Sequence, residues 1–250
     1  MNGAQRKRRG GVIEATVFAI VGVAILLGLG IWQLDRKTWK ENLIETVTTR
    51  IARAPENLPP RASWPRLLPE GNEYARVAFP AEFLPGEEAL VYTVGSPFRP
   101  DVKGPGYWLF APAQLAGGSI VVVNRGFVPL DRKDPATRSA GAPHGTVEIV
   151  GVMRWPEARG LFTPADDPKT NVWYLRDLTA MAAAKKWATA APFYIDQESP
   201  VPAGGVPLPG KIEVRLPDNH LQYAITWFGL ALALAGVYVV WLAGRLRRRS

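Results

Sequence analysis

Two long stretches without a charged side chain dominate the pattern of polar and apolar positions along the chain. Residues 15–34 (ATVFAIVGVAILLGLGIWQL) and 221–244 (LQYAITWFGLALALAGVYVVWLAG) contain no Asp, Glu, Lys or Arg. As a helix, each stretch would extend about 30 Å, which is the thickness of the hydrocarbon core of a bilayer. The pattern therefore predicts transmembrane helices at 12–34 and 220–244.

A secretory signal peptide is the alternative interpretation of the first stretch, because such peptides also begin with a basic segment followed by an apolar one. The stretch is longer than the roughly 7–15 apolar residues of a signal peptide. It also ends in the bulky Trp32-Gln33-Leu34 rather than in small residues suited to cleavage. These features favour an uncleaved membrane anchor.

Shorter apolar runs of the β type fill the region between the predicted spans, residues 35–219, and turn-rich segments separate them. These runs are 89–95, 106–112, 119–130, 146–153, 191–197 and 211–216. One further segment, 176–188, is rich in alanine and can begin as a helix capped by Asp177 or Thr179. We predict a membrane protein in which two transmembrane α-helices, N- and C-terminal, flank one mostly antiparallel β (α+β) extracytoplasmic domain.

The pattern is least regular in residues 53–70, which are rich in proline and are predicted to form an extended segment or a loop. We find no internal repeat in the chain and predict no heptad seam.

The formal net charge of +8 resides in two short tails rather than in the predicted domain. The tails are residues 1–11 and 245–250, and outside them 22 basic and 21 acidic residues remain between positions 35 and 220. A nucleic-acid-binding protein needs a basic face on its folded domain, so this distribution excludes that class.

The basic residues also predict the orientation of the spans. Four arginines follow the second span, whereas Lys211 and Arg215 are the nearby basic residues before it. The positive-inside rule therefore places the C-terminal tail, and with two spans also the N-terminal tail, in the cytoplasm. The domain at 35–219 is then periplasmic. We predict the bacterial inner membrane, because the leader is too short for a mitochondrial presequence before a span.

The composition excludes several kinds of chemistry. The chain has no cysteine, which excludes disulfides, covalent haem attachment and thiolate metal sites. Its two histidines, His144 and His220, are too few for a multi-histidine metal site within one chain. None of the GxSxG, Walker, HExxH or dinucleotide-binding motifs is present, so we predict that the protein is not an enzyme. His144 lies in the turn-like GAPHGT and is predicted to be at the surface.

Two aromatic clusters would lie at the outer face of the membrane. The first, GIWQLDRKTWK (30–40), is where the first span leaves the bilayer, and the second, NHLQYAITWF (219–228), is where the second span enters it. On a helix, His220, Tyr223 and Trp227 share one face because they are three and seven residues apart.

The aromatic residues of these clusters have two interpretations. Trp32, Trp39, Tyr223 and Trp227 are typical of an aromatic belt in the headgroup layer, where Arg36 can extend its charged end into water. The alternative is a surface that binds a ligand or a partner protein.

His220 is the residue of this region that can bind a metal. It follows Asp218-Asn219, so its ring lies beside a partly positive helix end and an apolar layer, and both favour the neutral imidazole. A neutral imidazole can ligate iron, and a flat apolar ligand could lie against Tyr223 and Trp227 with its acidic groups at the helix N-terminus or at Arg36. That description fits a haem. A histidine that only caps the helix or forms a hydrogen bond is the alternative.

The segment VVVNRGFVP (121–129) contains the third candidate site. Asn124-Arg125-Gly126 interrupts an apolar β run, which predicts a bulge or sharp strand end with Gly126 at a backbone angle that other residues disfavour. Arg125 either satisfies backbone carbonyls at the bulge or pairs with a haem propionate or a partner's carboxylate.

Several segments, taken in order, resemble the surfeit locus protein 1 family of cytochrome c oxidase assembly factors, and in particular its bacterial members. These segments are GIWQLDRKTWK, VVVNRGFVP, NVWYLRDLTAMA, APFYIDQ and HLQYAITWFGL. The resemblance includes the two-span topology and is weakest around residues 53–75. Residues of these motifs that are expected to contact partners or shape the fold are Trp32, Gln33, Trp39, Asn124 and Gly126.

The resemblance implies a chaperone that receives haem a, as transiently bound cargo, and aids its insertion into the catalytic subunit of an aa3-type oxidase. It implies His220 as the axial ligand, Tyr223 and Trp227 as a stacking wall, and Arg36 or Arg125 at the propionates. The implied partners are that catalytic subunit, haem a synthase and membrane lipid. The alternative is a membrane scaffold that holds the oxidase subunit without contacting haem, with small residues of the second span packed against partner helices.

Overall fold

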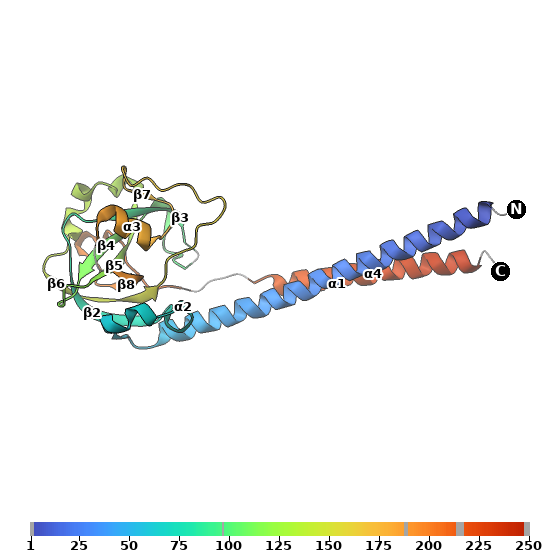
Figure 1. Cartoon of the computed structure of the whole chain (residues 1–250), viewed down its shortest axis with the longest axis horizontal. Coiled ribbons are helices and arrows are strands. Elements are labelled where there is room, and N and C mark those ends of the chain that lie inside the picture. The colour runs from blue at the N-terminus through green and yellow to red at the C-terminus, as the bar shows by residue number, and fades with distance from the viewer. Residues whose placement is uncertain (1–2, 97, 188–189, 214–217, 248–250) are drawn as a thin grey trace. The chain divides into compact units, whose positions relative to one another are not determined.

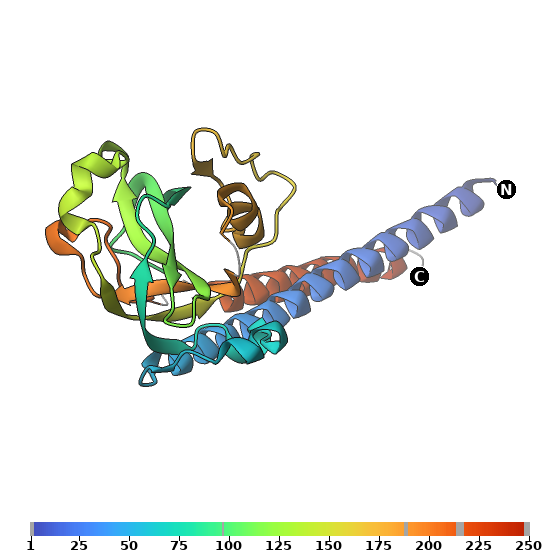
Figure 2. The ribbon, with the colours of Figure 1, turned by 60° about the vertical axis from the view of Figure 1, so that its left-hand side comes forward.

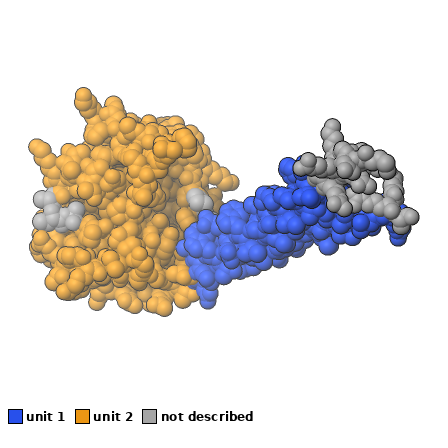
Figure 3. All heavy atoms as spheres, turned by 45° about the vertical axis from the view of Figure 1, so that its right-hand side comes forward, with its two compact units in different colours: residues 1–45, 216–250 blue, residues 46–215 orange. Residues whose placement is uncertain are grey.

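The computed structural model describes residues 3–247 apart from 97, 188–189 and 214–217. It divides into two compact units, which Figure 3 colours separately. The first unit combines Met1–Glu45 with Leu216–Ser250, and the second is Thr46–Arg215. Two long apolar helices, with one sheet domain between them in sequence, confirm the predicted fold class.

The first unit is an antiparallel pair of helices formed by α4 (His220–Arg247) and by α1 (Gly3–Ala52) as far as Glu45, and the two run side by side in Figures 1 and 2. Both helices are long and apolar enough to cross a membrane. α1 continues past the end of its apolar stretch because charged side chains are compatible with a helix and the next proline is Pro55. The depth of each helix in a bilayer stays a prediction, as do the predicted limits of the spans and of the domain.

Small residues let the two helices approach each other closely. A Cβ added to Gly22 would lie 2.8 Å from Cδ2 of Leu234, and one added to Gly30 would lie 2.4 Å from Cε1 of Phe228. On α4, Ala224 is buried in the same helix pair. Close approach through glycine and alanine is the usual way in which membrane helices pack, because lipid gives them no hydrophobic reason to associate.

The prediction that the chain has no heptad seam is wrong for α1. Its partly or fully buried positions include Thr16, Ala19, Val23, Leu26, Gly30 and Gln33, which are spaced alternately by three and four residues. Thr16 Oγ1 also lies 2.6 Å from the hydroxyl of Tyr238 on α4. The seam escaped prediction because it lies in a uniformly apolar stretch, where polarity does not distinguish one face of the helix from another.

The second unit is built on an eight-stranded sheet with short helices. The strands are β1 (Glu56–Asn57), β2 (Arg76–Phe83), β3 (Ala89–Gly95), β4 (Lys103–Gln114), β5 (Ile120–Pro129), β6 (Thr146–Arg154), β7 (Val172–Trp173) and β8 (Ala190–Ser199). The helices are α2 (Pro69–Asn72) and α3 (Leu178–Lys185), with 3-10 turns η1 (Arg61–Arg66), η2 (Leu130–Arg132), η3 (Pro135–Gly141) and η4 (Ala203–Gly205). Five strand pairings are antiparallel and three are parallel.

Five of the predicted strands correspond to β3, β4, β5, β6 and β8. The sixth, 211–216, is not a strand in its described part, and residues 214–216 lie outside the described residues. Sequence reasoning missed β2, because Pro80 interrupts it. Proline is tolerated there because β1 pairs with residues 77–78 of β2 and β4 with residues 82–83, which leaves one edge of the strand unpaired at Pro80 within the described residues. The irregular segment 53–70 contains β1 and η1.

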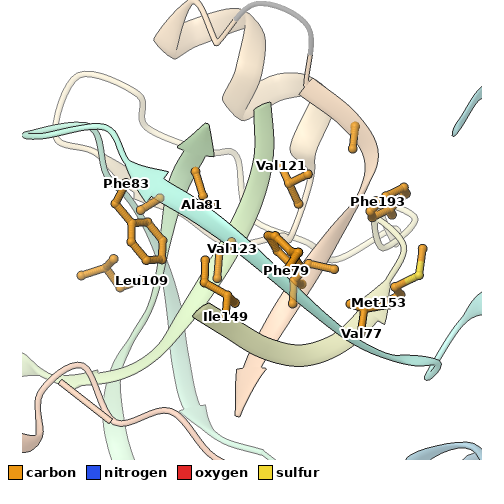
Figure 4. Close-up of a cluster of buried hydrophobic side chains, with 14 of the residues drawn as sticks. Val77, Phe79, Ala81, Phe83, Leu109, Val121, Val123, Ile149, Met153 and Phe193 are labelled. Carbon is orange, nitrogen blue, oxygen red and sulfur yellow. The ribbon is translucent and has the colours of Figure 1, made fainter. Parts of the chain in front are cut away.

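Five of the strands close into a ring. The order β2–β6–β8–β5–β4 is completed by an antiparallel pairing of β2 with β4, in which Phe83 lies opposite Ala113. The ring encloses the larger apolar cluster, part of which Figure 4 shows, with side chains from β2, β5 and β6 pointing toward one another. Trp64 of η1 belongs to the same cluster. Alternation along the strands puts their remaining side chains on the outer face.

The outer face carries a second apolar cluster, which α3 helps to bury. Trp108, Phe110 and Tyr194 of the sheet pack in this cluster with Met181 of α3. The helix begins as predicted, because the side chain of Asp177 accepts a hydrogen bond of 3.0 Å from the backbone N–H of Ala180.

Candidate functional site

His220 is the first residue of α4, and its ring is held by a residue of α1. The imidazole Nδ1 lies 2.7 Å from the side-chain oxygen Oε1 of Gln33. The backbone N–H of His220 donates to Asp218 Oδ1 over 2.9 Å, so Asp218 caps the start of α4 as predicted. His220 and Gln33 are 187 residues apart in sequence and meet because α1 and α4 are antiparallel.

This contact selects one tautomer of the His220 ring. An amide oxygen only accepts, so a neutral ring in this contact carries its proton on Nδ1 and donates it to Gln33. Nε2 then carries the lone pair, and within the described residues it has no hydrogen-bond partner. A histidine that ligates a metal through one ring nitrogen usually donates its other N–H to such an oxygen. Both alternatives weighed for this residue, a hydrogen-bonding role and a ligand role, are thus compatible with the geometry.

Trp227 and Tyr223 differ in their surroundings. The indole Nε1 of Trp227 is buried and has no hydrogen-bond partner among the described residues. Tyr223, by contrast, is 55% exposed. A buried N–H without an acceptor is costly, so the Trp227 indole has capacity for a further hydrogen bond.

The aromatic residues after the first apolar stretch lie on the outside of α1. Trp32 is 55% exposed and Trp39 is 51% exposed. The guanidinium carbon of Arg36 lies 4.0 Å from the ring centre of Trp39, which is a cation–π contact. This arrangement is the one expected of an aromatic belt, and the role of these residues in binding haem or a partner stays a prediction.

In the second unit, Asn124-Arg125-Gly126 forms the predicted bulge. Trp108 of β4 pairs with Phe127, but Phe110, two residues on, pairs with Asn124, three residues away on β5. Gly126 has a φ of 123°, and a Cβ there would lie 2.2 Å from the carbonyl oxygen of Leu208. The backbone therefore requires glycine at this position.

Arg125 points into the side of the sheet that carries the larger apolar cluster. It is 6% exposed, its Nη2 donates to the carbonyl oxygen of Gly141 over 2.8 Å, and its guanidinium lies 4.9 Å from the ring centre of Phe83. Its Nε is buried without a partner among the described residues. Burial lowers the pKa of Arg125 to about 10, since desolvation outweighs the attraction of Glu88. Arg125 thus satisfies one backbone carbonyl, and its pairing with a propionate stays a prediction.

Sequence reasoning missed a buried polar cluster on the outer face of the sheet. Arg154, 7% exposed, donates through Nε to Glu73 over 3.2 Å and through Nη1 to Asp196 over 3.3 Å. Asn124 donates to the other oxygen of Asp196 over 2.7 Å. Burial by itself would lower the pKa of Arg154, yet Tyr194 and then Asp196 raise that pKa above its ordinary value.

This polar cluster joins segments that are far apart in the sequence. Asn124 comes from VVVNRGFVP, Asp196 from APFYIDQ and Arg176 from NVWYLRDLTAMA, and all three line one small cavity of about 20 Å³. Arg176 Nη1 lies 3.3 Å from the hydroxyl of Tyr194. A polar or charged residue directly after a short apolar run, as in each of these segments, is the signal that could have identified the cluster.

The candidate residues therefore fall into two groups. His220 and Gln33 are in contact in the first unit, which also contains Trp227, whereas Arg125 and the bulge belong to the second. His144, in the second unit, is exposed as predicted.

Comparisons with known proteins point to one family. The SURF1 family model matches residues 20–232. The SURF1-like protein of Drosophila melanogaster is 37% identical over 229 residues, covering 86% of this chain and 73% of the relative. The SURF1-like protein of Monosiga brevicollis is 35% identical over 243 residues, covering 94% of this chain and 89% of the relative. Surfeit locus protein 1 of Homo sapiens is 35% identical over 219 residues, covering 82% of this chain and 70% of the relative. These relatives are eukaryotic, so they give the predicted bacterial origin no support.

Proposed function

Because this chain belongs to the SURF1 family, we propose that it is a membrane-tethered, non-enzymatic assembly factor for cytochrome c oxidase. In this proposal it binds haem a and assists its insertion into the catalytic subunit of an aa3-type oxidase. Two helices that are long and apolar enough to cross a membrane support the tether. The proposed location is the bacterial inner membrane, with the second unit in the periplasm and both termini in the cytoplasm, on the charge argument given above.

The observation that carries the haem proposal is the contact between His220 and Gln33. It holds the ring in the tautomer that leaves Nε2 available for iron, without competition from another described residue. Gln33 is neutral, so it orients the ring without adding the basicity that a carboxylate would give. A neutral orienting group suits reversible binding of a cargo.

The neighbouring residues have separate parts in this proposal. Trp227 offers a buried indole N–H that can donate to an acceptor on the ligand. Tyr223 presents an exposed ring against which a flat ligand can lie. Arg36, above Trp39, supplies a cation for a propionate. The proposed fit to a haem rests on these three groups, which are a hydrogen-bond donor, an exposed aromatic ring and a cation.

The test is haem retention by purified protein. We would co-express the chain with the enzymes that make haem a, purify it in detergent and measure the Soret absorbance per protein. The expected result is haem in the wild type, at least about tenfold less in His220→Ala, and a loss of about 10–100-fold in affinity in Gln33→Leu. His144→Ala is the matched control, because it removes the other histidine, and it should retain haem. Equal retention by His220→Ala would rule out His220 as the ligand.

The alternative function, a scaffold that never contacts haem, is favoured by one specific observation. Gly229, Ala233 and Gly236 are exposed on α4, and a Cβ at either glycine would meet nothing within 4 Å. These small residues face away from α1 and leave α4 a surface for helices of the oxidase subunit. A wild-type protein that co-purifies with the oxidase subunit but carries no haem would support this function instead.

A further inference from the structure

The second unit contains a cavity of about 260 Å³ that adjoins Arg125. Its lining includes Phe83 and Ala111 from the sheet, Glu88 from the loop after β2, and Arg138 and Ser139 from η3. A single water needs roughly 15 Å³ of such space, so the cavity can hold a small organic molecule.

Arg125 is the unusual member of this lining. A guanidinium has five N–H donors, yet Arg125 forms one hydrogen bond, to Gly141, and its buried Nε has none among the described residues. No carboxylate of the described residues lies within ion-pair distance of it. A cation that is nine-tenths buried without a counter-ion is costly, and such groups are normally paired.

The nearby carboxylates do not supply this counter-ion, because other groups occupy them. Glu88 accepts two hydrogen bonds from Arg138, of 2.8 and 2.5 Å. Glu87, which also lines the cavity, accepts a hydrogen bond of 3.1 Å from the indole N–H of Trp187. The acidic and basic lining residues thus leave the Arg125 guanidinium as the unpaired charge.

We propose that this cavity is a binding site for a small carboxylate, which Arg125 holds by charge-assisted hydrogen bonds. A guanidinium and a carboxylate are both planar and form two parallel hydrogen bonds. Phe83 and Ala111 give the ligand an apolar wall, so a short aliphatic acid suits the cavity better than a hydroxylated one. The proposal is independent of haem binding by the first unit.

The test uses the full-length protein in detergent and follows thermal unfolding by tryptophan fluorescence. Sodium propionate is the probe, and propionamide and sodium chloride at equal ionic strength are the controls for shape and for salt. We expect propionate to raise the midpoint temperature of unfolding, with an effect that levels off at high propionate concentration. Neither control should raise this temperature. A blocked aspartate, N-acetyl-aspartate methylamide, tests whether the acid belongs to a protein side chain rather than to a free molecule. Tighter binding of either acid identifies its source.

Two variants locate the site. Arg125→Met should raise the apparent dissociation constant for propionate at least about tenfold, because it removes the charge-assisted pair. Ser139→Phe leaves Arg125 in place but narrows the cavity, and it should weaken binding while the midpoint without ligand stays unchanged. Ala184→Phe, on the exposed side of α3, is the matched control and should bind as the wild type does. Equal effects of propionate and propionamide, or wild-type binding by Arg125→Met or Ser139→Phe, would overturn the proposal.

Discussion

Arg154 and Arg125 are equally buried, at 7% and 6% exposure, yet the protein treats their charges in opposite ways. Arg154 lies between Glu73 and Asp196, and these acidic neighbours hold its pKa above the ordinary value. Arg125 contacts one carbonyl and one aromatic ring, no carboxylate of the described residues lies within ion-pair distance of it, and burial lowers its pKa. Burial by itself therefore does not show whether an arginine is part of an ion pair. The presence or absence of a carboxylate within ion-pair distance shows this.

The two arginines are connected through the bulge in β5. Asn124, before the bulge, faces the Arg154 cluster, and Arg125 faces the cavity on the other side of the sheet. Alternation along the strand points these two neighbouring side chains toward two different sites, and the bulge lies at the same place.

The largest expected effect is that of Arg154→Met. The substitution leaves Glu73 and Asp196 without their cation in a buried site, and we expect the free energy of unfolding to fall by about 3–5 kcal/mol. Urea unfolding of the detergent-solubilised protein, followed by tryptophan fluorescence, measures this change. Arg125→Met is the matched variant and should change the free energy by less than about 1 kcal/mol, since it leaves no carboxylate unpaired. Equal losses in both variants would contradict the distinction between the two arginines.

A smaller effect is expected for Gly126→Ala, which disturbs both sites at once. The new methyl group would overlap the carbonyl of Leu208, and alanine disfavours a φ of 123°. We expect a loss of about 2–4 kcal/mol in the free energy of unfolding, from strain and overpacking together. Gly117→Ala, in an open turn, is the control and should stay within about 0.5 kcal/mol. An unchanged free energy of unfolding in Gly126→Ala would show that the backbone of the bulge can shift to accommodate the methyl group.

The smallest effect concerns Arg99, which is an intermediate case. Arg99 is 6% exposed, but its bidentate partner Asp101 has a side chain that is 51% exposed. The hydrogen bond from Arg99 holds the pKa of Asp101 below its ordinary value of 3.8, so this stabilisation is present above that value and is lost as the pH falls through the lowered pKa. Asp101→Asn should therefore cost less than about 1 kcal/mol at pH 7 and remove part of the acid dependence below about pH 4. Unfolding curves of both proteins from pH 7 to pH 3 provide the measurement.

Sequence reasoning succeeded for features that neighbours along the chain determine. The apolar stretches, five of the strands, the N-cap at Asp177 and the bulge at Gly126 follow from hydrophobic pattern and backbone preference within about ten residues. β2 was missed because Pro80 is a local signal against a strand, and the pairing of β2 with β4 and β6 overrides it.

The heptad seam of α1 was missed for a different reason. Its positions include valine and leucine as well as glycine, alanine, threonine and glutamine, and they lie in an apolar stretch, so no local contrast marks which face meets α4. The face is determined by which surface fits the partner helix, and this fit depends on shape rather than on polarity.

From residue order alone one learns that this protein has two membrane-compatible helices, a β-rich domain and a lone histidine at the start of the second helix. Only the tertiary structure places Gln33 beside His220 and carboxylates beside Arg154, and leaves Arg125 without a carboxylate partner in the part of the chain that is described. The physical reason is that pattern and propensity act between near neighbours, whereas hydrogen bonds and ion pairs require atoms within about 3–4 Å, whatever their separation along the chain.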